Sequence, residues 1–385
     1  MSKAHGYSDT LLVLYIATFL SQFSFGLGTF TVPIYAYELE ASPFLIGLIG
    51  ASAGITYTVT TMLFGLVSDR FSRRRLTSAA LAISTVAYVL YILSEDIGLL
   101  IPIRLVEWTA AALFWPSMEA LISDSSSPAS LDSALTRFNV AWGLAMVIGP
   151  LIAGLLITWF SVKSPFYLSA ATSLLASLLL ALVAVRTQVQ GGEERSTETI
   201  VTNSHQNSVF KALTTTFLLA FSTGAVMSLF PAYATVLGIP AYETGLIVLI
   251  SGLTQTLVFA KVRGIESVFT ESGLFIIGPV FFTLSTAMIT FSSTSFLFAI
   301  AFAVLGFASG IAYSASLSLM LRGRSSKRGL ATGLFEGMIG LGYLLGPLIG
   351  GILSEFDLRA PYVLTALTSV IVLTIQLFLR RGRRS

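Results

Sequence analysis

Twelve long apolar stretches follow one another along the chain, and they constrain its fold more than any other feature. Each is close to or above the ~20 residues that a helix needs to cross a bilayer. With 55% hydrophobic and only 11% charged residues, the chain has too little polar surface to cover so many apolar helices in water. We therefore predict an all-α integral membrane protein with twelve transmembrane helices, at residues 10–37, 44–67, 77–93, 98–123, 133–160, 165–185, 209–236, 241–262, 272–292, 295–321, 329–353 and 360–379.

Basic residues are distributed unevenly over the connections between these stretches. Counted with the N-terminal tail as zero, the odd-numbered connections hold only Lys163 and Arg359, whereas the even-numbered ones and both tails hold nineteen basic residues. Short loops rich in Lys and Arg stay in the cytoplasm, so we expect both termini there, in a multi-pass protein of the cell membrane. Topology and contact with anionic lipid account for the basic residues, and we expect no binding to nucleic acid.

The connection between the second and third stretches, from Gly65 to Leu76, reads GLVSDRFSRRRL. Its order resembles the signature loop of the major facilitator superfamily, Gly-x-Leu-x-Asp-Arg-x-Gly-Arg-Lys. Val67 and Ser72 depart from that pattern, and the positions that fit it are Gly65, Asp69, Arg70, Arg73 and Arg74. The resemblance implies a secondary transporter, most like the drug/proton antiporter-type members, that works by alternating access.

In that family the loop aspartate caps a neighbouring helix, and the arginines pair with acids at helix ends and latch the cytoplasmic side. We therefore expect a cytoplasmic gate in which Asp124, at the end of the fourth stretch, pairs with Arg70 or Arg73. The alternative is that these charges only fix the topology.

The two halves of the sequence resemble each other. A shift of 198 residues pairs Gly26 with Gly224 and Tyr35 with Tyr233, and a shift of 197 pairs Gly149-Pro150 with Gly346-Pro347. A parallel repeat of six helices, with the solute site between the halves, is the layout of this superfamily. We predict an N-terminal six-helix bundle over 1–185, a polar cytoplasmic linker over 186–208 and a C-terminal bundle over 209–385.

The fourth stretch carries the strongest chemical signal. Arg104 lies inside it, where a cation costs about 3 kcal/mol even on lenient insertion scales, and Glu107 follows three residues later on the same helix face. Their position resembles the superfamily motif Arg-x-x-Gln-Gly of proton-coupled exchangers, with Glu107 and Trp108 in place of Gln and Gly. We predict that Arg104 and Glu107 couple transport to protons. The alternative is a structural pair near the outer interface whose side chains reach water.

Glu336, inside the eleventh stretch, is the other buried acid that we predict to carry protons. Its repeat mate is Asn139 in the fifth stretch, so both halves place a polar group at the same position. The alternative is a neutral acid hydrogen-bonded to a neighbouring helix or to the basic loop.

Glycine and proline recur in the fifth and eleventh stretches. Gly342 to Gly351 fits the pattern Gly-x-x-x-Gly-Pro-x-x-Gly-Gly, which in the fifth helix resembles the antiporter motif of drug/proton exchangers; the fifth-stretch copy has Ala145 and Ala153 at two glycine positions. Proline kinks a helix and glycine lets another helix approach closely. We expect Gly149, Pro150, Gly346 and Pro347 to shape helix packing, and efflux to be favoured over uptake.

Polar and aromatic side chains on otherwise apolar helices are the candidates for solute binding: Gln22, Phe25, Tyr57, Trp108, Asn139, Trp142, Gln255, Tyr313 and Tyr343. A lining of this kind is aromatic, weakly polar and poor in charge. It suits an amphipathic or weakly basic organic solute better than a polyanion, which needs several buried cations.

Three functions are compatible with these observations. The first is proton-coupled efflux of small organic solutes; the second is uptake of sugars or organic acids by the same fold; the third is a membrane sensor that does not transport. The sequence contains no ATP-binding loop, metalloprotease motif or nucleophile elbow, so we expect no enzyme activity and no cofactor, with the proton gradient as the energy source. We expect a monomer.

Overall fold

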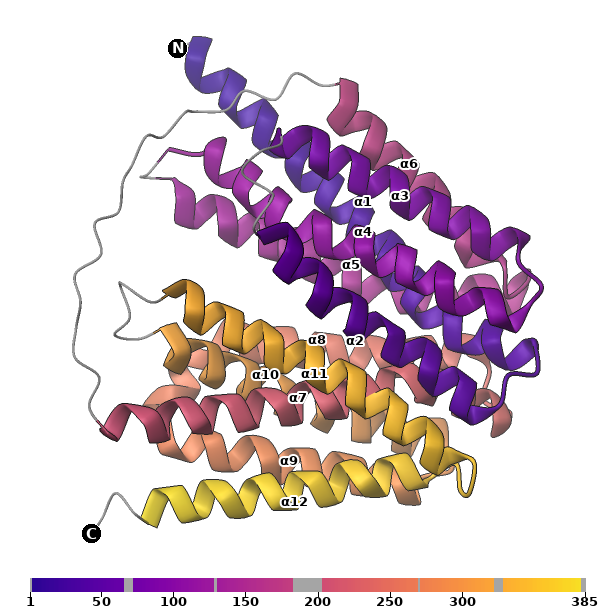
Figure 1. Cartoon of the computed structure of the whole chain (residues 1–385), viewed down its shortest axis with the longest axis vertical. Helices are drawn as coiled ribbons and strands as arrows, with labels where there is room; N and C mark the ends of the chain where they lie inside the picture. The colour runs from indigo at the N-terminus through magenta and orange to yellow at the C-terminus, as the bar shows by residue number, and fades with distance from the viewer. Residues whose placement is uncertain are drawn as a thin grey trace. The chain divides into compact units, whose positions relative to one another are not determined.

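A computed structural model describes residues 2–65, 72–127, 130–182, 203–268, 271–321 and 328–381. Within these ranges all regular structure is helical (Figure 1). The helices are α1 (Ser2–Glu38), α2 (Pro43–Gly65), α3 (Arg73–Leu93), α4 (Ile97–Asp124), α5 (Leu131–Trp159), α6 (Ser164–Leu182), α7 (Asn203–Val236), α8 (Ala241–Val268), α9 (Glu271–Phe291), α10 (Ser295–Leu321), α11 (Arg328–Ser354) and α12 (Ala360–Arg381).

Twelve of the described helices are long and apolar enough to cross a membrane, which confirms the predicted all-α membrane architecture. Several helices extend beyond the predicted apolar stretches. The third was expected from residue 77 but begins at Arg73, and α7 begins at Asn203, inside the stretch predicted as a linker. Backbone hydrogen bonding continues through polar residues once a helix has started, so an apolar pattern marks the membrane-buried part and not the helix ends.

Contacts divide the chain into two compact units. Unit 1 comprises Met1–Glu40, Thr56–Glu193 and Pro240–Gly245, and unit 2 comprises Ala41–Ile55, Glu194–Ile239 and Leu246–Ser385. Ala41–Ile55 belongs to unit 2 and Pro240–Gly245 to unit 1, although each segment lies in the other half of the sequence.

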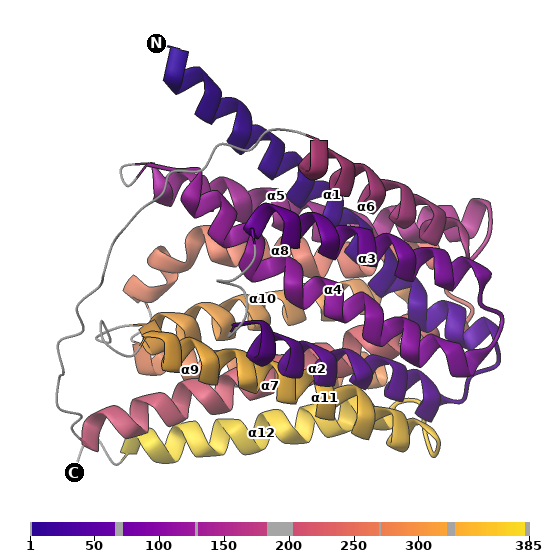
Figure 2. The ribbon, with the colours of Figure 1, turned by 45° about the horizontal axis from the view of Figure 1, so that its top comes forward.

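Helix packing inside unit 1 is repeated inside unit 2. In unit 1, α1 packs on α5 and α6, and α3 packs on α4 and α6 (Figure 1). In unit 2, α7 packs on α11 and α12, and α9 packs on α10 and α12 (Figure 2). Each pair in the second unit lies six helices after its counterpart in the first, so the repeat inferred from glycines and prolines extends to the packing.

Glycines allow close helix crossings in both units. A Cβ atom on Gly149 of α5 would lie 3.0 Å from Cα of Gly26 in α1. In the other unit, a Cβ atom on Gly346 of α11 would overlap the carbonyl oxygen of Phe221 in α7. Without a hydrophobic driving force between helices in lipid, close backbone approach is a main source of packing energy. Gly149 and Gly346 therefore lie at equivalent crossings.

We expect Gly346→Ala to lower the free energy of unfolding by about 1–3 kcal/mol, because the added methyl group has to displace the α7 backbone. Gly337 on the same helix is the matched control, since a Cβ atom there would meet nothing within 4 Å. Gly337→Ala should be neutral or slightly stabilising, because alanine favours helix more than glycine does. Thermal unfolding of both variants in detergent measures the difference; equal midpoints would contradict the crossing as described.

Serine hydroxyls join α6 to the rest of unit 1. Oγ of Ser24 in α1 lies 2.6 Å from Oγ of Ser173, and Oγ of Ser169 donates to the carbonyl oxygen of Ser24 at 3.0 Å. One helical turn after Ser173 on α6, Oγ of Ser177 donates to the carbonyl oxygen of Ser78 in α3 at 2.9 Å. Such interhelical hydrogen bonds stabilise helix association in the membrane, by about 0.6 kcal/mol on average.

Candidate functional site

A buried ion pair on α4 is the centre of the candidate site. Nη1 of Arg104 lies 2.7 Å from Oε2 of Glu107, and the two side chains are 5% and 1% exposed. Glu107 lies ten residues after Ile97, where α4 begins, so it is about 15 Å along the helix axis and roughly half-way through a ~30 Å hydrocarbon core. The pair is thus withdrawn from solvent and far from the end of its helix.

Two tyrosines of α3 complete the coordination of the Glu107 carboxylate. The hydroxyl of Tyr91 donates to Oε2 at 3.0 Å, and the hydroxyl of Tyr88 donates to Oε1 at 3.3 Å. Both tyrosines are at most 1% exposed. With Nη1 of Arg104, three donors therefore surround the two oxygens of the Glu107 side chain.

Helix α1 closes this site through a glycine. A Cβ atom on Gly28 would lie 2.6 Å from Cε1 of Tyr88 and 3.3 Å from Oε1 of Glu107. Only a residue without a side chain lets α1 pass this close to the ion pair. Gly28, Tyr88 and Tyr91 are not among the site residues predicted from the sequence. The i, i+3 spacing of the two tyrosines in an apolar helix was a usable signal, but nothing in the sequence said which helix they faced.

Three residues predicted to bind solute gather beside the ion pair. The ring of Trp108 lies 5.5 Å from Cζ of Arg104, within reach of a cation–π interaction. Phe25 of α1 and Tyr57 of α2 both meet Trp108 edge to face, with ring centroids 5.1 Å and 6.0 Å away. Nε of Arg104 is buried and has no acceptor among the described residues. The rings of Phe25, Tyr57 and Trp108 therefore form an aromatic wall beside Arg104, whose Nε donor is unused.

The other predicted solute-binding residues of unit 1 lie differently. Gln22 is 3% exposed, and its Oε1 accepts no hydrogen bond from the part of the chain that is described. The indole of Trp142 packs edge to face on Trp115, two turns along α4 from Trp108, with centroids 5.5 Å apart. Asn139 is exposed on α5. The structure places Trp142 in an aromatic cluster with Trp115, and none of its recorded ring contacts is with Trp108.

Unit 2 holds the remaining candidates. Tyr313 of α10 lies between Phe259 of α8 and Phe335 of α11, with ring centroids 5.6 Å away in both cases. Glu336 follows Phe335 on α11 and is partly exposed, and Tyr343 lies two turns further along, where Gly224 of α7 approaches its ring. Gln255 of α8 is partly exposed. These residues therefore lie on α8, α10 and α11 within one unit.

The comparison with known families decides the assignment. A model described as Major Facilitator Superfamily matches residues 14–264 and 269–385. The chain belongs to this superfamily. It is therefore a membrane transporter by family, not an enzyme, which confirms the predicted class.

This superfamily member is similar to Multidrug resistance protein 2 of Bacillus subtilis (strain 168), with 23% identity over 96% of the chain and 95% of the relative. It is also similar to the Quinolone resistance protein NorA of Staphylococcus aureus (strain MRSA252), with 22% identity over 95% and 96%.

Two solved structures share the fold. A bacterial homolog of the human lysosomal transporter Spinster, in an inward-facing and occupied conformation, matches with a TM-score of 0.82 and 14% identity, covering 98% of this chain and 97% of that one. The nucleoside transporter NupG matches with a TM-score of 0.77 and 18% identity, covering 96% and 99%. At such low identities these matches establish the architecture alone.

The superfamily signature loop lies partly outside the described residues. Asp69 and Arg70 are not described, and Gly65 is the last residue of α2. Arg73 is described: its Nη1 lies 2.7 Å from Oδ1 of Asp124, at side-chain exposures of 39% and 29%. The pairing expected for Asp124 with Arg70 or Arg73 is thus present with Arg73, while its role as a gate stays a prediction.

Arginines at the start of α3 also cap the ends of two neighbouring helices. Nη1 of Arg73 donates to the carbonyl oxygen of Ala120 in the last turns of α4, at 3.3 Å. Nε of Arg74 donates to the carbonyl oxygen of Leu180 near the end of α6, at 2.7 Å. The last carbonyls of a helix lack partners within the helix and carry partial negative charge, so a cation there is stabilising. Three helices of unit 1 are joined at this end by two arginines.

Proposed function

We propose that this superfamily member exports small, weakly basic or amphipathic organic solutes in exchange for protons. The observation that carries the proposal is the Arg104–Glu107 pair, buried at mid-helix beside the aromatic ring of Trp108. An ionised pair in the hydrocarbon depth of a membrane protein marks a functional site by default, because its desolvation is costly. The names of the relatives, multidrug resistance and quinolone resistance proteins, support the same direction of transport.

The charge balance of this site supports proton coupling. Glu107 accepts hydrogen bonds from Arg104, Tyr88 and Tyr91, and a proton on the carboxylate removes the charge that holds Arg104 in place. Charges attract each other strongly in an apolar surrounding, so Arg104 stays beside Glu107 when Glu107 is ionised and is free to move away when Glu107 is protonated. A cationic or amphipathic solute that stacks on the aromatic wall competes with Arg104 for the same carboxylate. We propose that Glu336 of unit 2 acts as a second proton carrier.

Orientation and gating complete the proposal. The excess of basic residues in the even-numbered connections and tails supports cytoplasmic termini, and with this orientation we expect the Arg73–Asp124 pair on the cytoplasmic side. This pair is partly exposed and joins the start of α3 to the end of α4, so its separation allows these helix ends to move apart. We propose that it acts as a cytoplasmic latch, that the transporter works as a monomer and that it requires no cofactor.

The decisive experiment uses the full-length protein in inverted membrane vesicles or proteoliposomes. An imposed proton gradient, acidic in the lumen, is expected to drive accumulation of a fluorescent cationic dye, and a protonophore is expected to abolish it. A sugar or organic-acid counterflow that is indifferent to the gradient would instead establish uptake or facilitation. Absence of transport across cationic, neutral and anionic solutes would favour a sensor and overturn the proposal.

A further inference from the structure

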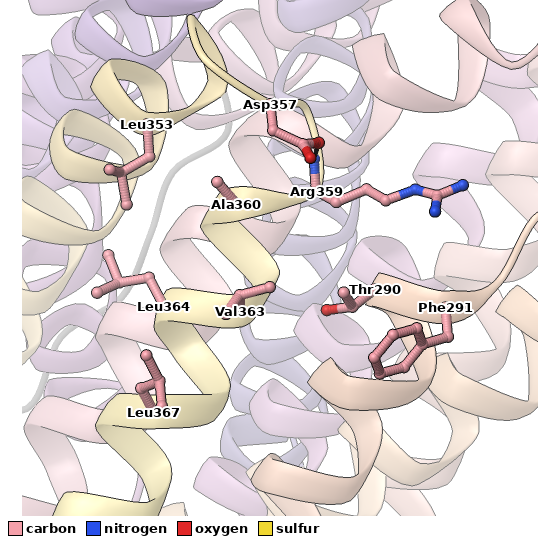
Figure 3. Close-up of a pocket in the computed structure, with 9 residues that line it drawn as sticks. All are labelled: Thr290, Phe291, Leu353, Asp357, Arg359, Ala360, Val363, Leu364 and Leu367. Atoms are coloured by element: carbon pink, nitrogen blue, oxygen red, sulfur yellow. Dashed lines mark hydrogen bonds between the residues drawn. The ribbon is translucent and has the colours of Figure 1, made fainter.

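A groove in unit 2 is lined by none of the residues predicted to bind solute or to carry protons. Its volume is about 480 Å³ (Figure 3). Two residues come from the end of α9, one from α11, two from the connection between α11 and α12, and four from the first turns of α12: Thr290, Phe291, Leu353, Asp357, Arg359, Ala360, Val363, Leu364 and Leu367.

The groove is amphipathic along its length. Asp357 and Arg359 lie at one end, just before α12 begins at Ala360, and ions at this level belong at the headgroup layer of a bilayer. Leu367 lies seven residues further along α12, about 10 Å deeper along the helix axis. Val363 and Leu367 are 43% and 57% exposed, so apolar surface continues from the charged end into the hydrocarbon layer.

The charged end offers both signs of charge in a fixed arrangement. Oδ1 of Asp357 accepts the backbone N–H of Arg359 at 2.8 Å, and Nε of Arg359 donates to the hydroxyl of Tyr233 at 3.3 Å. The hydrogen bond to Tyr233 raises the pKa of the Arg359 side chain above its already high ordinary value, so the guanidinium stays charged. No protein acceptor for its Nη atoms is found among the described residues, and these donors remain available to a ligand.

The balance of charge selects the kind of headgroup. The connection between α11 and α12 carries Glu355, Asp357 and Arg359, two negative charges against one positive charge. A headgroup with a net negative charge is disfavoured there. A zwitterionic headgroup places its phosphate on the Arg359 guanidinium and its cationic end toward the Asp357 carboxylate, and an ammonium with N–H donors satisfies that carboxylate better than a quaternary one does.

We propose that this groove is a binding site for a membrane phospholipid with an ethanolamine headgroup. The phosphate binds Arg359, the ammonium binds Asp357, and one acyl chain lies along Val363, Leu364 and Leu367. The site does not depend on the transported solute or on proton coupling, and its test is independent of both.

The test is native mass spectrometry of the purified full-length protein, titrated with phosphatidylethanolamine, phosphatidylcholine and phosphatidylglycerol of identical acyl chains. Wild-type protein is expected to retain the ethanolamine lipid in preference to the other two. Arg359→Gln is expected to weaken binding of the ethanolamine lipid about tenfold, the loss of one charge-assisted contact. Asp357→Asn is expected to remove the preference for ethanolamine over choline. Equal retention of all three lipids by wild-type protein would overturn the proposal.

Two matched controls separate lipid contact from loop structure. Tyr233→Phe removes the internal partner of Arg359 but keeps the guanidinium, and lipid binding is expected to stay within about twofold of wild type; a loss as large as that of Arg359→Gln would overturn direct contact.

Val363→Trp fills the groove, and binding is expected to fall. Val370, two turns further on α12, is 45% exposed against 43% for Val363 and does not line the groove, so Val370→Trp is expected to leave binding unchanged. Equal effects of the two tryptophans would contradict the groove as the site.

Discussion

Glu107→Ala is expected to lower the free energy of unfolding by about 3–5 kcal/mol, one of the two largest effects that this structure predicts. The substitution leaves the Arg104 guanidinium, whose side chain is 5% exposed, without its anion. It also leaves the hydroxyls of Tyr88 and Tyr91 without their acceptor. Arg104→Ala is expected to be destabilising for the converse reason. Thermal and denaturant unfolding in detergent, followed by intrinsic fluorescence, measures both variants.

The control for this prediction is the double variant Arg104→Met/Glu107→Leu. Replacing both members of a buried ion pair by apolar residues of similar volume is often neutral or stabilising, so the double variant should recover the part of the lost stability that comes from the unpaired Arg104 guanidinium. The part that comes from the hydroxyls of Tyr88 and Tyr91 should stay lost, because they have no acceptor in this variant either. Transport should remain absent, because the charges required for coupling are gone. If each single variant unfolds within about 1 kcal/mol of wild type, the pair is not buried as described.

Local periodicity explains why half of the candidate site could be predicted. Arg104 and Glu107 lie three residues apart on one helix, and α-helical geometry alone brings such side chains together. Their partners Tyr88 and Tyr91 lie on another helix, and Gly28 lies on a third. Which faces meet depends on the packing of α1, α3 and α4, and an apolar sequence does not encode this in its hydrophobic pattern, because every face of a membrane helix is apolar.

The same limit applies to the aromatic residues. Trp108 and Trp142 were both predicted to bind solute because both are large polar-edged aromatics in apolar helices. The structure places Trp108 against Arg104 but Trp142 against Trp115. The repeat of glycines and prolines was more informative about which helices pack together. Gly149 lies where α5 crosses α1 and Gly346 where α11 crosses α7, because close approach of two helices requires a small residue at the crossing.

Glu107→Gln is expected to abolish accumulation of solute driven by a proton gradient while leaving counterflow of solute without a gradient. The amide is nearly the shape of the carboxylate: its oxygen accepts from Arg104 and Tyr91 at the position of Oε2, and its NH2 group donates to the hydroxyl of Tyr88 at the position of Oε1. It does not exchange a proton. The substitution therefore separates proton coupling from solute binding, which Glu107→Ala does not do. Accumulation of a cationic dye in inverted vesicles, with the pH of the lumen varied, measures the first quantity, and counterflow in proteoliposomes measures the second.

Glu119 provides the matched control on the same helix. Its side chain is exposed, three turns beyond Glu107 along α4, and Glu119→Gln should keep full gradient-driven accumulation. Glu336→Gln tests the proposed second carrier in unit 2, and loss of accumulation in both Glu107→Gln and Glu336→Gln would assign two proton-binding groups, one in each half. If proton dependence is unaltered in both, neither carboxyl couples transport to protons, and the buried pair on α4 serves structure alone.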